Sequence, residues 1–131
     1  MPKIETVDSI NNEKFPYSAV TKIGDYYHFS GVVPKLDKNN KLVSPGVIVN
    51  QTKEVLGKIV SLLKACGLSA KDIYGVTVML VGTMDDFPEV NKIYAEFFTD
   101  VKIKPRRKAF AVAALPFDSM IEIEVDAVKQ D

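Results

Sequence analysis

An apolar, β-branched run at residues 73–81 (IYGVTVMLV) lies between two segments with helical periodicity, and this pattern restricts the fold more than any other feature. Such a run is expected for a central strand that is covered on both sides. Before it, at residues 47–66, apolar residues recur at the i, i+3, i+4, i+7 spacing of an amphipathic helix. After it, Thr83 and the acid three positions on, Asp86, resemble a capping box and predict a second helix that runs to about Phe98.

Strand patterns occupy both ends of the chain. Residues 20–31 alternate around Gly24-Asp25, which predicts two short antiparallel strands joined by a tight turn. Residues 108–115 are small and apolar, and residues 120–128 alternate between an apolar face and an acidic face. The order β-β-β-α-β-α-β-β predicts an α+β domain with two helices packed on one face of a mostly antiparallel sheet.

The second face of this predicted sheet has no cover within the chain, because both helices pack on the first. Ala109, Ala111 and Ala113 alternate along one predicted strand. Their side chains are too small and apolar to make a favourable solvated surface, so we expect burial against another subunit. The sequence therefore predicts an oligomer.

Length and charge narrow the class of protein. A chain of 131 residues predicts one domain, residues 1–131. The 17 basic and 17 acidic residues cancel, which counts against a nucleic-acid partner because phosphate binding normally requires a basic surface. The single cysteine, the absence of a signal-peptide pattern and the absence of a long apolar run predict a cytoplasmic protein that does not enter a membrane.

Common catalytic motifs are absent from the sequence, which contains no GxGxxG, Walker loop, HExxH, CxxC or GxSxG. We therefore expect neither a cofactor nor a metal ion. His28, the single histidine, is interpreted as a hydrogen-bonded structural residue, with a role as general base as the alternative.

Two other polar residues stand out by their position. Asn91 falls on the apolar face of the second predicted helix, where it either ties the helix to a neighbouring loop or faces a ligand. Arg107 points to the same side of its strand as the alanine row, while Arg106 and Lys108 point the other way. A guanidinium group in that place can bind a carboxylate with two parallel hydrogen bonds. The alternative is an ion pair with a strand acid such as Glu122.

Six short motifs in order along the chain carry a family resemblance. They are Pro16-Tyr17-Ser18, Ser30-Gly31, Gln51-Thr52, residues 84–87 (MDDF) with 90–98 (VNKIYAEFF), Pro105-Arg106-Arg107 and Ile121-Glu122-Ile123-Glu124. Over nearly its whole length the sequence resembles the reactive intermediate deaminase family (RidA, formerly YjgF). The resemblance implies a chorismate-mutase-like α+β fold that assembles as a homotrimer with clefts at the subunit interfaces.

The same resemblance implies an activity and a site. Members of that family hydrolyse enamine or imine intermediates, such as 2-aminoacrylate, to 2-keto acids and ammonia without a cofactor. The family pattern Pro-x-Arg places the carboxylate-binding arginine at Arg107, and Tyr17, Ser30, Asn91 and Glu122 match positions that line the cleft. An imine carbon is already electrophilic, so positioning and an activated water suffice. We expect Arg107 to bind the substrate carboxylate, Glu122 to orient or deprotonate water, and Tyr17 and Asn91 to shape the pocket.

The sequence departs from the family pattern at four positions near these motifs. Phe15 replaces a glycine, Ala19 and Val32 each replace a glutamine, and Lys108 replaces a small residue. We expect Lys108 to point away from the cleft, and Phe15 and Val32 to reshape its entrance. Two other functions remain open: a single-stranded RNA endoribonuclease or translation inhibitor, and a non-catalytic trimer that binds small carboxylates.

Overall fold

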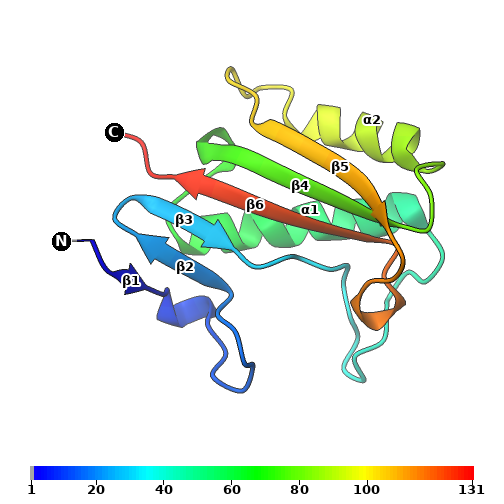
Figure 1. Ribbon diagram of the computed structural model, residues 1–131, viewed down its shortest axis with the longest axis horizontal. Helices are drawn as coiled ribbons and strands as arrows, with labels where there is room; N and C mark the ends of the chain where they lie inside the picture. The colour runs from blue at the N-terminus through cyan, green and yellow to red at the C-terminus, as the bar shows by residue number, and fades with distance from the viewer. Residues whose placement is uncertain (1) are drawn as a thin grey trace.

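The computed structural model describes residues 2–131 and has the order of elements that the sequence predicts (Figure 1). The strands are β1 (Ile4–Glu5), β2 (Val20–Ile23), β3 (Tyr26–Phe29), β4 (Ile73–Val81), β5 (Arg106–Val112) and β6 (Ile121–Val128). The helices are α1 (Ile48–Ala65) and α2 (Phe87–Phe97), with short 3-10 turns η1 (Asp8–Ile10), η2 (Ala70–Asp72) and η3 (Pro116–Asp118).

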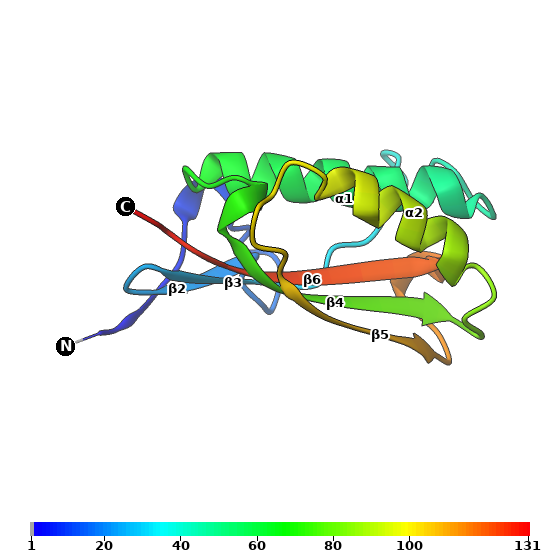
Figure 2. The ribbon, with the colours of Figure 1, turned by 90° about the horizontal axis from the view of Figure 1, so that it is seen from above.

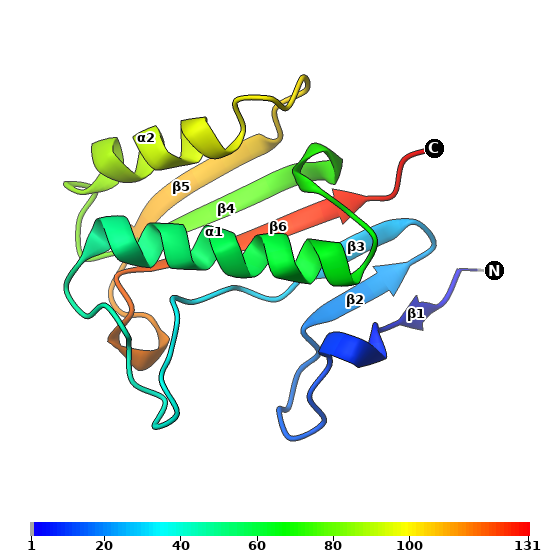
Figure 3. The same ribbon diagram turned by 180° about the vertical axis from the view of Figure 1, so that it is seen from behind.

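The strands form one six-stranded sheet in the order β1-β2-β3-β6-β4-β5. All neighbouring pairs are antiparallel except β4 and β5, which are parallel and are joined through α2. Figures 2 and 3 show both helices on the same face of the sheet, with α1 and α2 side by side. The predicted fold class, two helices on one face of a mostly antiparallel sheet, is confirmed.

The hydrophobic core lies between the helices and this face of the sheet. The α1 stripe supplies Val55, Leu56, Ile59 and Leu63, all buried. The alternation of β6 buries Ile121, Ile123, Val125 and Ala127 against them and turns the acids of the strand to the other face. Within residues 2–131, neither helix combines the length and the apolar character that crossing a membrane requires.

The opposite face of the sheet is not covered by any element in residues 2–131 (Figure 2). The central strand β4 is therefore covered on one face only, with Val78 buried and Thr77 half-buried. The alanine row of β5 is not on this open face. Ala109 pairs with Val78 and Ala111 pairs with Leu80, both buried beneath the helices, and paired residues point to the same side of a sheet. The prediction that these alanines share one side of the strand was correct, but the prediction that this side is the uncovered face of the sheet was wrong.

The start of α2 also differs from the prediction. The helix begins at Phe87, and Asp86 at the N-cap position makes no side-chain capping bond. The hydroxyl oxygen of Thr83 instead accepts a hydrogen bond from the backbone N–H of Asp85 at 3.2 Å. The Thr83 side chain therefore closes a local turn before the helix. This local hydrogen bond takes the place of the helix-capping bond that the sequence predicts.

Candidate functional site

Alternation correctly groups Arg107 with Ala109 and Ala111, but this side of the edge strand β5 faces the helices and not, as had been expected, the open face of the sheet. Arg107 pairs with Val76, which is buried under the helices. Its Nη1 donates a hydrogen bond to Oδ1 of Asn91 on α2 at 2.6 Å. Asn91 thus ties α2 to the edge strand and fixes one side of the guanidinium group.

Two aromatic rings of α2 complete the surroundings of this arginine. The guanidinium carbon of Arg107 lies 5.2 Å from the centroid of the Phe87 ring and 4.6 Å from that of Tyr94. Burial raises the pKa of Tyr94, with the positive charge of Arg107 opposing that shift, so the phenol stays neutral at physiological pH. Neither ring was predicted as a site residue, although Phe87, Asn91 and Tyr94 have the i, i+4, i+7 spacing of one helix face.

The remaining donors of Arg107 are available to a ligand. The side chain is exposed, and among residues 2–131 only one of its five N–H groups has a hydrogen-bond partner. A planar donor fork held by an amide and two rings is suited to a carboxylate. We call Arg107, Asn91, Phe87 and Tyr94 the arginine clamp.

Glu122 lies on the open face of the sheet and packs against the main chain of Gly31. A Cβ atom on Gly31 would overlap the Glu122 carboxyl group, so a residue larger than glycine here requires the Glu122 side chain to move. Burial raises the pKa of Glu122, and the neighbouring charge of Glu124 raises it further. The Glu122 carboxyl group therefore gains and loses its proton at a higher pH than an ordinary glutamate does.

Tyr17 and Ser30 belong to the same region as Glu122. The hydroxyl of Ser30 donates to the carbonyl of Ser18 at 2.6 Å, which fixes the end of β3 beside the loop that carries Tyr17. Tyr17 is exposed and stacks on Phe15 with ring centroids 5.4 Å apart. Tyr17, Ser30 and Gly31 line a groove of about 860 Å³. We call Tyr17, Ser30, Gly31 and Glu122 the acid cluster.

Gln51, from the motif that opens α1, holds the strand that carries Glu122. The side chain is fully buried. Its Nε2 donates to the carbonyl of Ser44 at 3.0 Å, and its Oε1 accepts from the backbone N–H of Met120 at 2.9 Å. The amide therefore fixes the chain two residues before Glu122.

The arginine clamp and the acid cluster lie apart within one chain. Arg107 is on the helix side of β5, whereas Glu122 points to the open face from β6. Their places in the register also differ, because Arg107 pairs with Val76 and Glu122 pairs with Met79. The alternative that Arg107 forms an ion pair with Glu122 of its own chain is therefore wrong: among residues 2–131, no salt bridge joins them.

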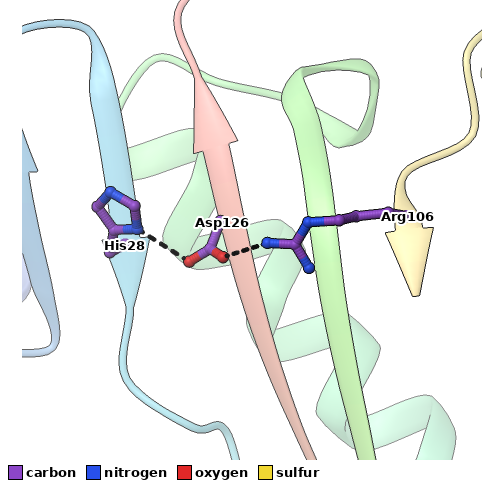
Figure 4. A network of polar contacts seen from close by, with 3 residues as sticks. All are labelled: His28, Arg106 and Asp126. Carbon is purple, nitrogen blue, oxygen red and sulfur yellow. Dashed lines mark hydrogen bonds and ion pairs between the residues drawn. The ribbon is translucent and has the colours of Figure 1, made fainter. Parts of the chain in front are cut away.

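The single histidine belongs to a polar network on the open face (Figure 4). Nδ1 of His28 lies 3.0 Å from Oδ1 of Asp126, and Nη2 of Arg106 lies 3.5 Å from Oδ2 of the same carboxylate. The hydrogen bond expected of His28 is confirmed. Residues 2–131 contain no group of three His, Cys, Asp or Glu side chains placed to hold a metal ion.

Sequence comparison places these residues within a known family. The model of the family described as Endoribonuclease L-PSP matches residues 9–129. A RutC family protein of Pyrococcus horikoshii is 41% identical over 88% of this chain and 88% of its own length. A 2-iminobutanoate/2-iminopropanoate deaminase of Mus musculus is 37% identical over 87% of this chain and 82% of its own length.

Solved structures agree with that placement. The YjgF gene product of E. coli has a TM-score of 0.81 and 30% identity, and the match covers 96% of this chain and 99% of that one. E. coli TdcF with bound serine has a TM-score of 0.79 and 30% identity, with 97% of this chain and 98% of that one covered. The chain therefore belongs to the endoribonuclease L-PSP family, which is the RidA/YjgF family.

Proposed function

We propose that this protein hydrolyses reactive enamine or imine intermediates, such as 2-aminoacrylate, to 2-keto acids and ammonia. We further propose that it acts as a cytoplasmic homotrimer without a cofactor. The arginine clamp is the observation that carries this proposal, because it presents free, oriented donors that match a substrate carboxylate. Relatives support the reaction: the mouse protein is named a 2-iminobutanoate/2-iminopropanoate deaminase.

The site requires residues of two chains in this proposal. Within one chain Arg107 and Glu122 lie on opposite faces of the sheet. A subunit interface that sets the clamp of one chain against the acid cluster of the next brings them together. The uncovered sheet face supports such an assembly, since it carries exposed apolar side chains, among them Tyr26 and Phe110.

The chemistry follows from the two groups. Arg107 holds the carboxylate, which places the adjacent imine carbon within the site. Glu122 accepts a proton from water as the oxygen attacks that carbon, and the protonated carboxyl group then gives this proton to the imine nitrogen, which returns Glu122 to its carboxylate form. The resulting tetrahedral carbinolamine loses ammonia and leaves a 2-keto acid, so one water is consumed for each ammonia released. Tyr17 and Asn91 shape the pocket and the clamp, and Ser30 fixes the acid cluster.

The test of this proposal measures 2-keto acid formation from 2-aminoacrylate generated in the assay. We expect Arg107→Ala to lower kcat/KM by at least ~100-fold, because two charge-assisted hydrogen bonds of about 1.5–3 kcal/mol each are lost. The matched control is Arg106→Ala, which removes the neighbouring guanidinium from the other face and should leave the rate near that of the wild type. Equal rates for both variants and the wild type contradict the proposal, and binding of a 2-keto acid without turnover favours a non-catalytic carboxylate sensor.

The family description gives one reason to test RNA cleavage as a second activity. Basic residues at 102, 104 and 106–108 lie close together in the sequence around β5, but Arg106 is engaged by Asp126. RNA cleavage that persists through further purification and is abolished in Arg107→Ala supports this activity. Cleavage that disappears on purification rejects it.

A further inference from the structure

The groove beside the acid cluster is much larger than a three-carbon imino acid needs. Its volume is about 860 Å³, within the ~300–1,000 Å³ range of pockets that bury drug-sized ligands. Tyr17 and Ser30, two residues of the proposed site, line one part of it together with Gly31, which packs against Glu122. The reacting atoms of a small imino acid therefore leave most of this groove empty, and the rest of the groove can hold another part of the substrate.

Aromatic rings stand on both sides of this groove. Phe15 and Tyr17 are stacked in the loop before β2, and Phe117 lies in η3. Figure 3 shows these two segments on either side of the chain that leads from β3 to α1. Each of the three rings is at least half exposed, although aromatic side chains are normally buried. Apolar residues Ala19 and Val32 also line the groove.

Phe117 is held in this place at a conformational cost. Its φ is 61°, and the next residue, Asp118, has φ 60°. The left-handed region is unusual for a bulky side chain, and such residues cluster at functional sites. The ring gains little burial in return, because it is half exposed. A fold that places a strained, exposed ring at a groove is consistent with a ring that contacts a ligand.

The charged groups at the α1 side of the groove are already satisfied within the protein. Nζ of Lys58 donates to the carbonyls of Val33 and Pro34, both at 2.9 Å, and burial lowers its pKa despite the charge of Glu54. Glu54 accepts a hydrogen bond from Ser44 at 2.8 Å. These groups offer little to a charged substrate side chain, whereas the aromatic walls offer apolar contact.

We propose that this groove binds the side chain of the substrate, and that the preferred substrates are 2-imino acids with an aromatic or branched aliphatic side chain. Phe15, Tyr17 and Phe117 form the specificity-determining surface, which contacts the side chain while the arginine clamp holds the carboxylate. This inference rests on the proposed function, because that function supplies the imino acid.

The test compares imines that an amino-acid oxidase generates from L-phenylalanine, L-leucine and L-alanine. The variant is Phe117→Gly, which removes the ring and also relieves the left-handed backbone, so we expect it to fold. The matched control is Asp118→Gly, which relieves the neighbouring strain and keeps the ring. In the wild type, kcat/KM for the larger imines should exceed that for the alanine imine by at least ~10-fold. This ratio should fall about fivefold or more in Phe117→Gly and stay unchanged in Asp118→Gly.

A binding arm separates failure of the inference from failure of the proposed function. Phenylpyruvate and pyruvate are titrated against each variant and followed by NMR, which requires no turnover. Tighter binding of phenylpyruvate that is lost in Phe117→Gly supports the groove even if no imine is hydrolysed. Hydrolysis of all three imines at equal kcat/KM, or equal binding of the two keto acids, overturns the inference and leaves the proposed deaminase function standing.

Discussion

Replacing Tyr94 tests whether the arginine clamp is a binding device or only a packing contact. The Tyr94 ring lies 4.6 Å from the Arg107 guanidinium carbon and 4.8 Å from the centroid of the Phe98 ring. Tyr94→Leu removes the cation–π contact. Such a contact contributes about 0.5–1 kcal/mol at an exposed arginine, so we expect a roughly two- to fivefold rise in Kd for a small 2-keto acid.

Tyr94→Phe keeps the ring and removes only the hydroxyl. That hydroxyl is buried and has no hydrogen-bond partner among residues 2–131. Because an unsatisfied buried polar group costs about 1–3 kcal/mol, we expect Tyr94→Phe to raise Tm and to leave Kd unchanged.

Phe97→Leu is the matched control for Tyr94→Leu. Phe97 belongs to the same helix and packs on Phe98 with centroids 4.9 Å apart, and among residues 2–131 no cation–π contact joins it to Arg107. The assay is an NMR titration with 2-oxobutanoate, together with kcat and KM for 2-aminoacrylate. We expect the Tyr94→Leu effect in KM and not in kcat. An equal loss of affinity in Phe97→Leu and Tyr94→Leu, or a loss in Tyr94→Phe, refutes the reasoning.

Other predictions concern the acid cluster. Gly31→Ala should displace the Glu122 carboxylate and lower kcat with little change in Tm. The control is Gly75→Ala, whose added Cβ meets only the end of the Arg106 side chain and which should keep full activity. A normal kcat in Gly31→Ala contradicts this prediction. Because the pKa of Glu122 is raised, activity should fall with decreasing pH at a higher pH than an ordinary glutamate gives, and Glu124→Gln should move that limb to lower pH. The pKa of Glu122 is higher in the folded protein than in the unfolded chain, so the protonated carboxyl group stabilises the fold fully at pH values below the unfolded-state pKa. This stabilisation is lost as the pH rises through the folded-state pKa. Glu122→Gln should therefore raise Tm at pH 7 more than at pH 4, and equal shifts would contradict a raised pKa.

Much of the fold could be predicted because periodicity is a local signal. The apolar stripe of α1 and the alternation of β6 determine which residues are buried, whatever the rest of the chain does. Alternation also predicts which residues share a face of β5. It does not predict which face the helices cover, and for this reason Ala109 and Ala111 were assigned to the open face. Their true side follows from pairing with β4, which is a tertiary contact.

The residues of the candidate site could be selected from the sequence one by one, but their arrangement could not be predicted. Strand alternation groups Arg107 with the alanine row of β5 but not with the correct face, and Asn91, expected to tie its helix to a loop, instead contacts Arg107 on a strand. The separation of Arg107 from Glu122 depends on strand order and register, which no local pattern encodes. The left-handed backbone of Phe117 was also hidden, because the sequence there contains no glycine to signal it.

The most direct test of the account mixes two inactive chains. Arg107→Ala and Glu122→Gln chains are purified separately, unfolded together in equal amounts and refolded. If one site takes Arg107 from one chain and Glu122 from the next, about a quarter of the sites in random trimers regain both residues, and the mixture recovers about that fraction of wild-type activity. If each chain carries a complete site, the mixture stays as inactive as the separate variants, and the account of a site shared between subunits is wrong.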